Sequence, residues 1–169
     1  MTHTSLPVLV RQAQWDDLDT IVAFNAAMAQ ETENRRLDPA QLREGVKALL
    51  ATPQHGFYVV AEIPEIGGHR VVGQLMITFE WSDWRNGLFW WIQSVYVAPA
   101  QRRKGIFRAL QQHIRTKAQA DPQICGIRLY VDQDNRRAQT VYERMGLARS
   151  RYTVFEQDFV FLGQSGPQT

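Results

Sequence analysis

The stretch VYVAPAQRRKGIFRAL, residues 95–110, constrains the fold of this chain more than any other segment. It joins an alternating apolar run, typical of a strand, to an amphipathic helix through a turn with a proline and a glycine. Such a junction places unpaired backbone N–H groups and the positive end of a helix dipole at one point. The pattern therefore predicts a site for a small anion such as phosphate. The alternative is a basic solvated loop with an ordinary turn glycine.

Gly105 and the cations around it are the residues that would form this site. Glycine lets the backbone approach a ligand closely because it has no Cβ. Four cations would attract phosphate at longer range, namely Arg102, Arg103, Lys104 and Arg108. The sequence lacks both the Gly-x-Gly-x-x-Gly pattern of dinucleotide-binding folds and the Walker pattern of nucleotide-binding loops. The phosphate would therefore be held in a different way.

Length and composition favour one folded domain. The chain has 169 residues, of which 44% are hydrophobic, and this is enough for one buried core. We expect a single domain over residues 1–163 and a flexible tail over residues 164–169, which are mostly Gly, Pro and polar residues. The single cysteine, Cys125, excludes an internal disulfide and fits a reducing compartment. We expect it to be a small buried side chain rather than a reactive thiol.

Charge and hydropathy argue against several classes of function. The chain has 19 Lys and Arg against 17 Asp and Glu, a balance too even to indicate nucleic-acid binding, which stays a weak alternative based on the Arg clusters. No segment reaches the roughly 20 apolar residues of a membrane span, and the N-terminus lacks a signal peptide's apolar run. The expected location is therefore the cytoplasm. The four histidines lack metal-ligand spacing, so we expect no metal.

The hydrophobic patterns predict an α/β fold with a mixed, mostly antiparallel sheet flanked by about four helices. Helices are expected up to about Gln30, from Pro39 until before Pro53, over residues 104–120 and over residues 136–145. Strands are expected over residues 9–11, 57–62, 71–81, 88–97, 125–131 and 151–161. The strands at 88–97 and 125–131 are joined through a helix, so they should be parallel.

Two segments resemble motifs of the GNAT family of N-acetyltransferases. Residues 102–107 are similar to the family's acyl-coenzyme A signature Gln/Arg-x-x-Gly-x-Gly/Ala, with Phe107 in place of the last small residue. Residues 135–147 are similar to its later motif Asn-x-x-Ala-x-x-x-Tyr-x-x-x-Gly-Phe, with Leu147 in place of Phe. The order of elements agrees over nearly the whole chain. The resemblance implies a single domain with about seven strands, including a splayed parallel central pair.

The resemblance also implies a reaction and its cosubstrate. The chain would transfer an acetyl group from acetyl-coenzyme A directly to a primary amine of a small molecule or peptide, without a metal. A non-catalytic sensor that binds acyl-coenzyme A is the alternative. A homodimer is common among relatives, and no nucleic-acid or membrane partner is implied. The cofactor-binding residues would be Val95, Tyr96, Val97, Arg102, Arg103, Lys104, Gly105, Ile106, Phe107, Arg108, Asn135 and Tyr142.

The family role of Tyr142 is that of a general acid, which protonates or hydrogen-bonds the departing thiolate; its alternative is a core aromatic residue. Asn135 would contact the pantetheine arm, cap the following helix, or do both. Many relatives carry a glutamate base where this chain has Gln93. Glu80 and Asp83 are then the nearest candidates for a base or an amine anchor, and each is otherwise a solvated surface residue. Acidic residues in two segments, 30–38 and 80–87, favour a cationic acceptor.

Overall fold

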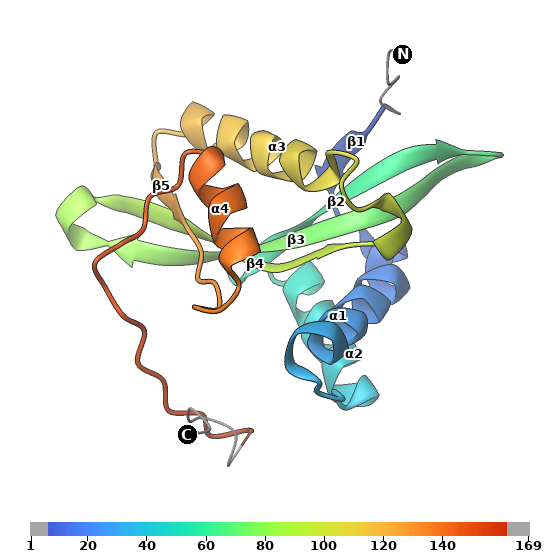
Figure 1. Cartoon of the computed structure of the whole chain (residues 1–169), viewed down its shortest axis with the longest axis horizontal. Helices are drawn as coiled ribbons and strands as arrows, with labels where there is room; N and C mark the ends of the chain where they lie inside the picture. The colour runs from blue at the N-terminus through green and yellow to red at the C-terminus, as the bar shows by residue number, and fades with distance from the viewer. Residues whose placement is uncertain (1–6, 162–169) are drawn as a thin grey trace. The chain divides into compact units, whose positions relative to one another are not determined.

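The structure, a computed structural model, describes residues 7–161. These residues form two compact units, of which the first ends at Leu129 and the second begins at Tyr130. Figure 1 shows the chain coloured from blue at its N-terminus to red at its C-terminus. Within the described residues, the first unit contains a sheet and three α-helices, and the second contains one α-helix.

The sheet of the first unit has five strands within residues 7–129. In spatial order they are β1 (Leu9–Gln12), β2 (Gly56–Glu65), β3 (Gly68–Ser82), β4 (Gly87–Val97) and β5 (Ile124–Arg128). The first three pairings are antiparallel, and β4 and β5 are parallel. The expected mixed, mostly antiparallel sheet is confirmed, and so is the parallel pair, whose strands are connected through a helix.

The expected number of about seven strands is wrong for residues 7–161, which hold five. Residues 151–161, predicted as the last strand, contain no strand, and most of their large apolar side chains are exposed. Alternating apolar residues form a strand only where a neighbouring strand takes up their backbone hydrogen bonds. The parallel pair also lies at one end of the described sheet rather than at its centre. The tail predicted over residues 164–169 lies outside the described part of the chain.

Helices cover both faces of the sheet (Figure 1). A short 3₁₀ turn, η1 (Trp15–Asp17), leads into α1 (Leu18–Glu33), which lies with α2 (Pro39–Ala51) on one face, and α3 (Ile106–Ala120) lies on the other. The start of α2 follows the sequence prediction. Asp38 caps it by accepting a hydrogen bond from the Gln41 amide at 2.6 Å, and Pro39 takes the first helical position.

Each face of the sheet has its own apolar core. The core beneath α3 contains Val59, Leu75, Ile77, Trp90, Ile92, Ile106, Leu110 and Ile114 among its buried residues. The core beneath α1 and α2 contains Leu18, Ile21, Val46, Tyr58 and Val60. Leu110 and Ile114 are fully buried, and each such side chain stabilises the fold by about 1.5–3 kcal/mol. This packing holds α3 against the sheet and so sets the position of its first turn.

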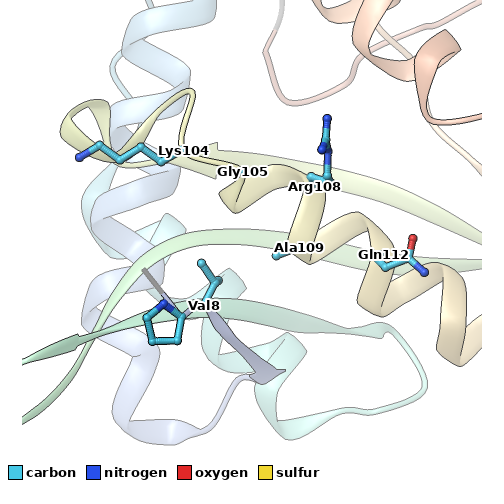
Figure 2. A pocket seen from close by; sticks show the side chains of 7 residues that line it. Val8, Lys104, Gly105, Arg108, Ala109 and Gln112 are labelled. Carbon is cyan, nitrogen blue, oxygen red and sulfur yellow. The ribbon is translucent and has the colours of Figure 1, made fainter. Parts of the chain in front are cut away.

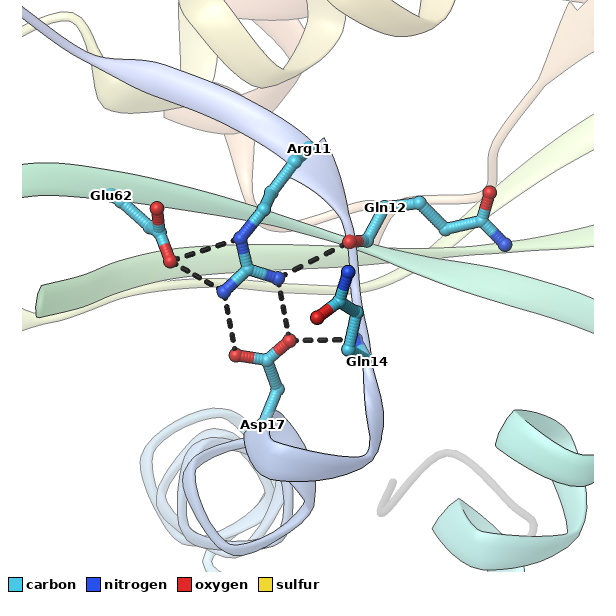
Figure 3. Close-up of polar contacts among 5 residues, drawn as sticks. All are labelled: Arg11, Gln12, Gln14, Asp17 and Glu62. Atoms are coloured by element: carbon cyan, nitrogen blue, oxygen red, sulfur yellow. Dashed lines mark hydrogen bonds and ion pairs between the residues drawn. The ribbon is translucent and has the colours of Figure 1, made fainter. Parts of the chain in front are cut away.

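An ionic cluster joins β1, β2 and the start of α1 (Figure 3). Arg11 donates to the two oxygens of Asp17 at 2.7 and 3.0 Å and, through Nε, to Glu62 Oε1 at 3.0 Å. The side chains of Asp17 and Glu62 are only 6% and 10% exposed, so Arg11 provides charge compensation that water cannot. Burial alone would raise the pKa of Asp17, but its hydrogen bonds from Arg11 and from the Gln14 amide lower that pKa below its ordinary value.

The second unit is organised around α4 (Arg136–Arg144). The Asn135 side chain accepts a hydrogen bond from the Ala138 amide at 3.0 Å, which confirms its expected role as the cap of this helix. Gly146 follows the helix in the left-handed conformation, with a φ of 87°. Arg149 donates to Gln139 at 2.7 Å and so ties the next segment to the helix.

No helix within residues 7–161 combines the length and apolar character needed to cross a membrane.

Candidate functional site

β4 contains a bulge at Ser94 and Val95. In its pairing with β3, Gln74 lies opposite Tyr96, whereas Met76 lies opposite Gln93, so these two residues of β4 face a single residue of β3. Ser94 has a φ of 49°, a left-handed conformation that is uncommon for a residue with a side chain. Bulges of this kind bend a strand and often lie beside functional sites. The sequence pattern of residues 88–97 did not reveal this irregularity.

A buried polar network supports the bulge from the side of α1. Gln74, which has no exposed surface, donates from Nε2 to Asn25 Oδ1 at 2.7 Å and to the Ser94 carbonyl at 3.4 Å. Asn25 in turn donates to the Tyr58 hydroxyl at 3.0 Å. Burial raises the pKa of Tyr58, which is also hydrogen-bonded to the Ser94 side chain. The Nε2 group of Gln74 thereby joins α1 to the Ser94 carbonyl, which favours the observed conformation of the bulge.

Beyond Trp91, one edge of β4 is open among the described strands. Within the described strands, the ladder between β4 and β5 stops at Trp91 and Arg128, whereas β4 continues to Val97. Val95, Tyr96 and Val97, the predicted binding strand, lie in this extension. Backbone groups at an open edge can pair with the amides of an extended ligand in the way that an added strand would. The geometry therefore fits an amide-bearing arm laid along β4.

The predicted anion site follows directly after this edge. A 3₁₀ turn, η3 (Pro99–Gln101), leads into a loop in which Arg103 and Gly105 are left-handed, with φ values of 65° and 85°. Gly105 is the N-cap of α3 and offers no side chain to the first-turn amides of the helix. These amides have no acceptor within the helix, and they coincide with the positive end of its dipole. The arrangement suits a diphosphate.

A hollow of about 490 Å³ lies beside the start of α3 (Figure 2). Its lining residues are Pro7, Val8, Lys104, Gly105, Arg108, Ala109 and Gln112. In Figure 2, Ala109 faces Val8, whereas Lys104 and Arg108 extend in different directions from the helix start. Lys104 also donates to the Gln101 side chain at 3.2 Å. Ile106 is buried beneath the loop and Phe107 is half-buried, so the exposed cations and the backbone, rather than these apolar side chains, are available to an anion.

Gly73 on β3 allows α3 to start this close to the sheet. A Cβ at this position would lie 2.8 Å from Ile106 Cγ2 and 3.3 Å from the Tyr96 carbonyl oxygen. Gly73 was not predicted as a site residue, although a glycine in the interior of a strand is a known signal of close backbone approach. Gln74 and Asn25 were not predicted either, because their contacts join segments far apart in the sequence.

Arg102, predicted to attract phosphate, is engaged within the protein. Its Nε donates to the Val97 carbonyl at 2.9 Å, and its Nη2 donates to Glu31 Oε2 at 2.6 Å. The hydroxyl of Tyr96 donates to the other oxygen of Glu31 at 2.9 Å. Arg102 is thus brought together with the end of β4 and the end of α1.

Glu80, the predicted base, is held by two partners. Trp91 donates its indole N–H to one oxygen, and Arg128 donates to both oxygens at 2.9 and 3.0 Å. The hydrogen bond from Trp91, together with Arg128, lowers the pKa of Glu80. A general base works best with a pKa near the operating pH, so these contacts favour a structural role. Asp83 accepts from the Trp84 amide at 2.8 Å, in the short turn η2 (Asp83–Arg85).

Gln93 and Tyr142 complete the predicted set. Gln93, at the position where relatives often have a base, donates to the Thr78 hydroxyl at 2.6 Å. Tyr142 lies on α4 in the second unit, and burial raises the pKa of its phenol. The phenol therefore stays protonated at neutral pH, as a proton or hydrogen-bond donor must. No three His, Cys, Asp or Glu side chains are grouped to hold a metal ion within residues 7–161.

Comparisons with known proteins give solved structures of similar fold. A possible acetyltransferase from Clostridium difficile 630 is 44% identical, with a TM-score of 0.83, over 90% of this chain and 98% of that one. The ribosomal-protein-alanine N-acetyltransferase from Brucella melitensis biovar Abortus 2308 is 17% identical, with a TM-score of 0.70, over 90% of this chain and 99% of that one. The latter shows likeness of fold alone. No curated protein matches the sequence significantly. The model of the acetyltransferase (GNAT) family matches residues 14–147, and the chain belongs to this family.

Proposed function

We propose that this protein transfers an acetyl group from acetyl-coenzyme A to a primary amine of a small molecule or peptide. The observation that carries the proposal is the open edge of β4 beyond Trp91, which leads straight into the uncapped start of α3. Acetyl-coenzyme A has an amide-bearing pantetheine arm and a diphosphate, the two groups that these features would bind. Membership of the GNAT family supports the same cosubstrate.

The proposed chemistry is a direct transfer. The lone pair of a neutral amine attacks the thioester carbonyl, the C–N bond forms, the C–S bond breaks, and coenzyme A leaves as a thiolate. The attacking nitrogen loses one proton as the amide forms, and the thiolate or solvent takes up this proton. A free alkylamine has a pKa of about 10, so its proton must be lost before the attack. Gln93 cannot accept this proton, and the pKa of Glu80 is lowered. A water path to solvent therefore fits the described residues better than abstraction by Glu80.

Tyr142 is proposed to donate to the departing thiolate. Its pKa is raised above the ordinary phenol value of about 10, whereas a thiol has a pKa near 8.5. Full proton transfer from the phenol would therefore be uphill, and a hydrogen bond to the developing thiolate is the favoured form of assistance. We expect Tyr142→Phe to lower kcat on the order of 10- to 100-fold while changing the Kd for coenzyme A less than about twofold. Equal kcat values for the two proteins would contradict this role.

The decisive experiment is acceptor profiling with acetyl-coenzyme A. Release of free thiol would be followed against a panel of small amines and short peptides, with each acceptor omitted in turn. Acceptor-dependent thiol release, with the acetylated amine found by mass spectrometry, would support the proposal. Saturable binding of acetyl-coenzyme A without turnover of any acceptor would instead favour a non-catalytic sensor. Absence of binding would reject both functions.

A further inference from the structure

Glu31 connects α1 to the loop that precedes α3. It lies in the last turn of α1, and its two oxygens accept from Tyr96 at 2.9 Å and from Arg102 at 2.6 Å. The guanidinium of Arg102 also lies 5.4 Å from the centre of the Tyr96 ring. Tyr96 follows the bulge in β4, and Arg102 begins the loop at residues 102–105. A single carboxylate thus joins a helix, a strand and a loop.

The position of Glu31 is unfavourable for α1 by itself. The last turn of a helix carries the negative end of its dipole, where an acidic side chain is destabilising. The last turn of α1 contains no basic residue. Arg102, from a segment 71 positions away, provides the compensating charge. The pair is about two-fifths exposed on both sides, so its contribution to overall stability is small, and its geometry matters more than its energy.

Arg102 links Glu31 to the loop at residues 102–105. Its Nε holds the Val97 carbonyl at 2.9 Å, while its backbone N–H donates to the Pro99 carbonyl at 3.3 Å. The residue is therefore fixed by its side chain at both the end of β4 and the end of α1. The left-handed Arg103 follows it directly, and Gly105 lies two residues later. The direction of the first-turn amides of α3 depends on this fixed start.

We propose that Glu31 is a positioning residue for the diphosphate of the acetyl donor and acts through Arg102; this inference rests on the proposed function. A different role for Arg102 makes the opposite prediction. If Arg102 bound the phosphate with its own side chain, Glu31 would compete with the ligand, and loss of the Glu31 charge would tighten binding. If Glu31 positions the loop, the same loss weakens binding.

The test is calorimetry with coenzyme A on Glu31→Gln, Arg102→Gln and the double variant. We expect each single variant to raise the Kd about fivefold, and the double variant to bind no more weakly than Arg102→Gln alone. Asp19→Asn is the matched control because Asp19 is also on α1 and pairs with an arginine, Arg43, of another element. This control should bind coenzyme A like the unaltered protein.

A second readout separates positioning from a general loss of structure. S-acetylpantetheine lacks the diphosphate, so its kcat/KM as a donor should change less than about twofold in Glu31→Gln. Unchanged or tighter binding of coenzyme A by Glu31→Gln would overturn the inference and leave the proposed function intact. An equal loss with both donors would also overturn it. Failure of the unaltered protein to bind coenzyme A would overturn the proposed function and the inference together.

Discussion

Glu31 and Glu80, which lie in the acidic segments 30–38 and 80–87, are each paired with an arginine. Glu31 accepts from Arg102 at 2.6 Å, and Glu80 accepts from Arg128 at 2.9 and 3.0 Å. In the sequence, the acidic residues of segments 30–38 and 80–87 favoured a cationic acceptor. A carboxylate bound to a guanidinium has little attraction left for a further ammonium group. The contacts of Glu31 and Glu80 therefore weaken that expectation.

The lowered pKa of Glu80 makes a prediction about pH. A carboxyl group with a depressed folded-state pKa contributes stability above its unfolded value of about 4.3 and loses it as pH falls through the folded value. Glu80 is therefore ionised throughout the range from about pH 6 to 9. We expect Glu80→Gln to leave the shape of the kcat/KM profile unchanged across this range, with less than about 1 kcal/mol lost in unfolding free energy at pH 7.

Asp83→Asn is the control for Glu80→Gln, because Asp83 is the other candidate base and has a different set of partners. Loss of the acidic limb of the profile in Glu80→Gln alone would show that Glu80 accepts the proton, and our structural assignment would then be wrong. Loss of that limb in Asp83→Asn alone would identify Asp83 instead.

At the scale of elements, the close contact between β3 and α3 decides where the candidate anion site lies. Ile106, the first residue of α3, is 3% exposed and packs over Gly73. The helix start is thereby held against the strand pair whose edge would carry the pantetheine arm. Small displacements at such a contact are costly because cores are closely packed, and they would change the direction of the first-turn amides.

Gly73→Ala tests this contact. The added Cβ would meet Ile106 Cγ2 at 2.8 Å, and buried Ile106 cannot move without shifting the helix. We expect a Kd for coenzyme A raised about tenfold and an unfolding free energy lowered by about 1–3 kcal/mol. Calorimetry and urea unfolding would measure the two effects.

Gly45→Ala on α2 is the control, since nothing lies within 4 Å of its added Cβ, and it should stabilise the protein by about 0.5–1 kcal/mol. Unaltered binding in Gly73→Ala would show that the contact does not set the site.

For the first unit as a whole, stability depends on contacts between segments far apart in the sequence. The Arg11 cluster joins β1 to β2 across 51 positions and to η1 across six. Asp17 and Glu62 are both buried, and both are paired with the same guanidinium. Removal of one cation would therefore leave two buried carboxylates uncompensated.

Arg11→Ala should lower the unfolding free energy at pH 7 by about 3–5 kcal/mol. The lowered pKa of Asp17 stabilises the intact protein above its unfolded value of about 3.9, and this contribution disappears as pH falls through the folded value. Arg11→Ala lacks this contribution, so the difference in unfolding free energy between the two proteins should shrink toward acidic pH. Urea unfolding at neutral pH and at a pH below about 3 measures this. Arg43→Ala is the control, because Asp19, the partner of Arg43, is 81% exposed. It should lower the unfolding free energy by less than about 1 kcal/mol at both pH values. If the loss of unfolding free energy in Arg11→Ala did not depend on pH, Arg11 would not be the residue that compensates the charge of Asp17.

Most elements of the first unit could be predicted from the sequence because their signals are local. The cap at Asp38 and Pro39 and the periodicity of residues 106–120 are properties of short segments, and the structure has both. The predicted anion loop depends on the same kind of signal, since Gly105 and the helix after it are adjacent in the chain. The strand expected at residues 151–161 is absent because a strand also requires a partner, which apolar alternation does not specify.

Side-chain spacing and backbone chemistry along short stretches were enough to predict the strands and helices between residues 9 and 144, the parallel pair and the uncapped start of α3. The availability of each charge to a ligand depends on long-range packing instead. This packing paired Glu31 with Arg102 and Glu80 with Arg128, and it supported the Ser94 bulge with Gln74 and Asn25. These partners lie between 20 and 71 positions apart, so packing of the sheet against its helices, and no local pattern, brings them together.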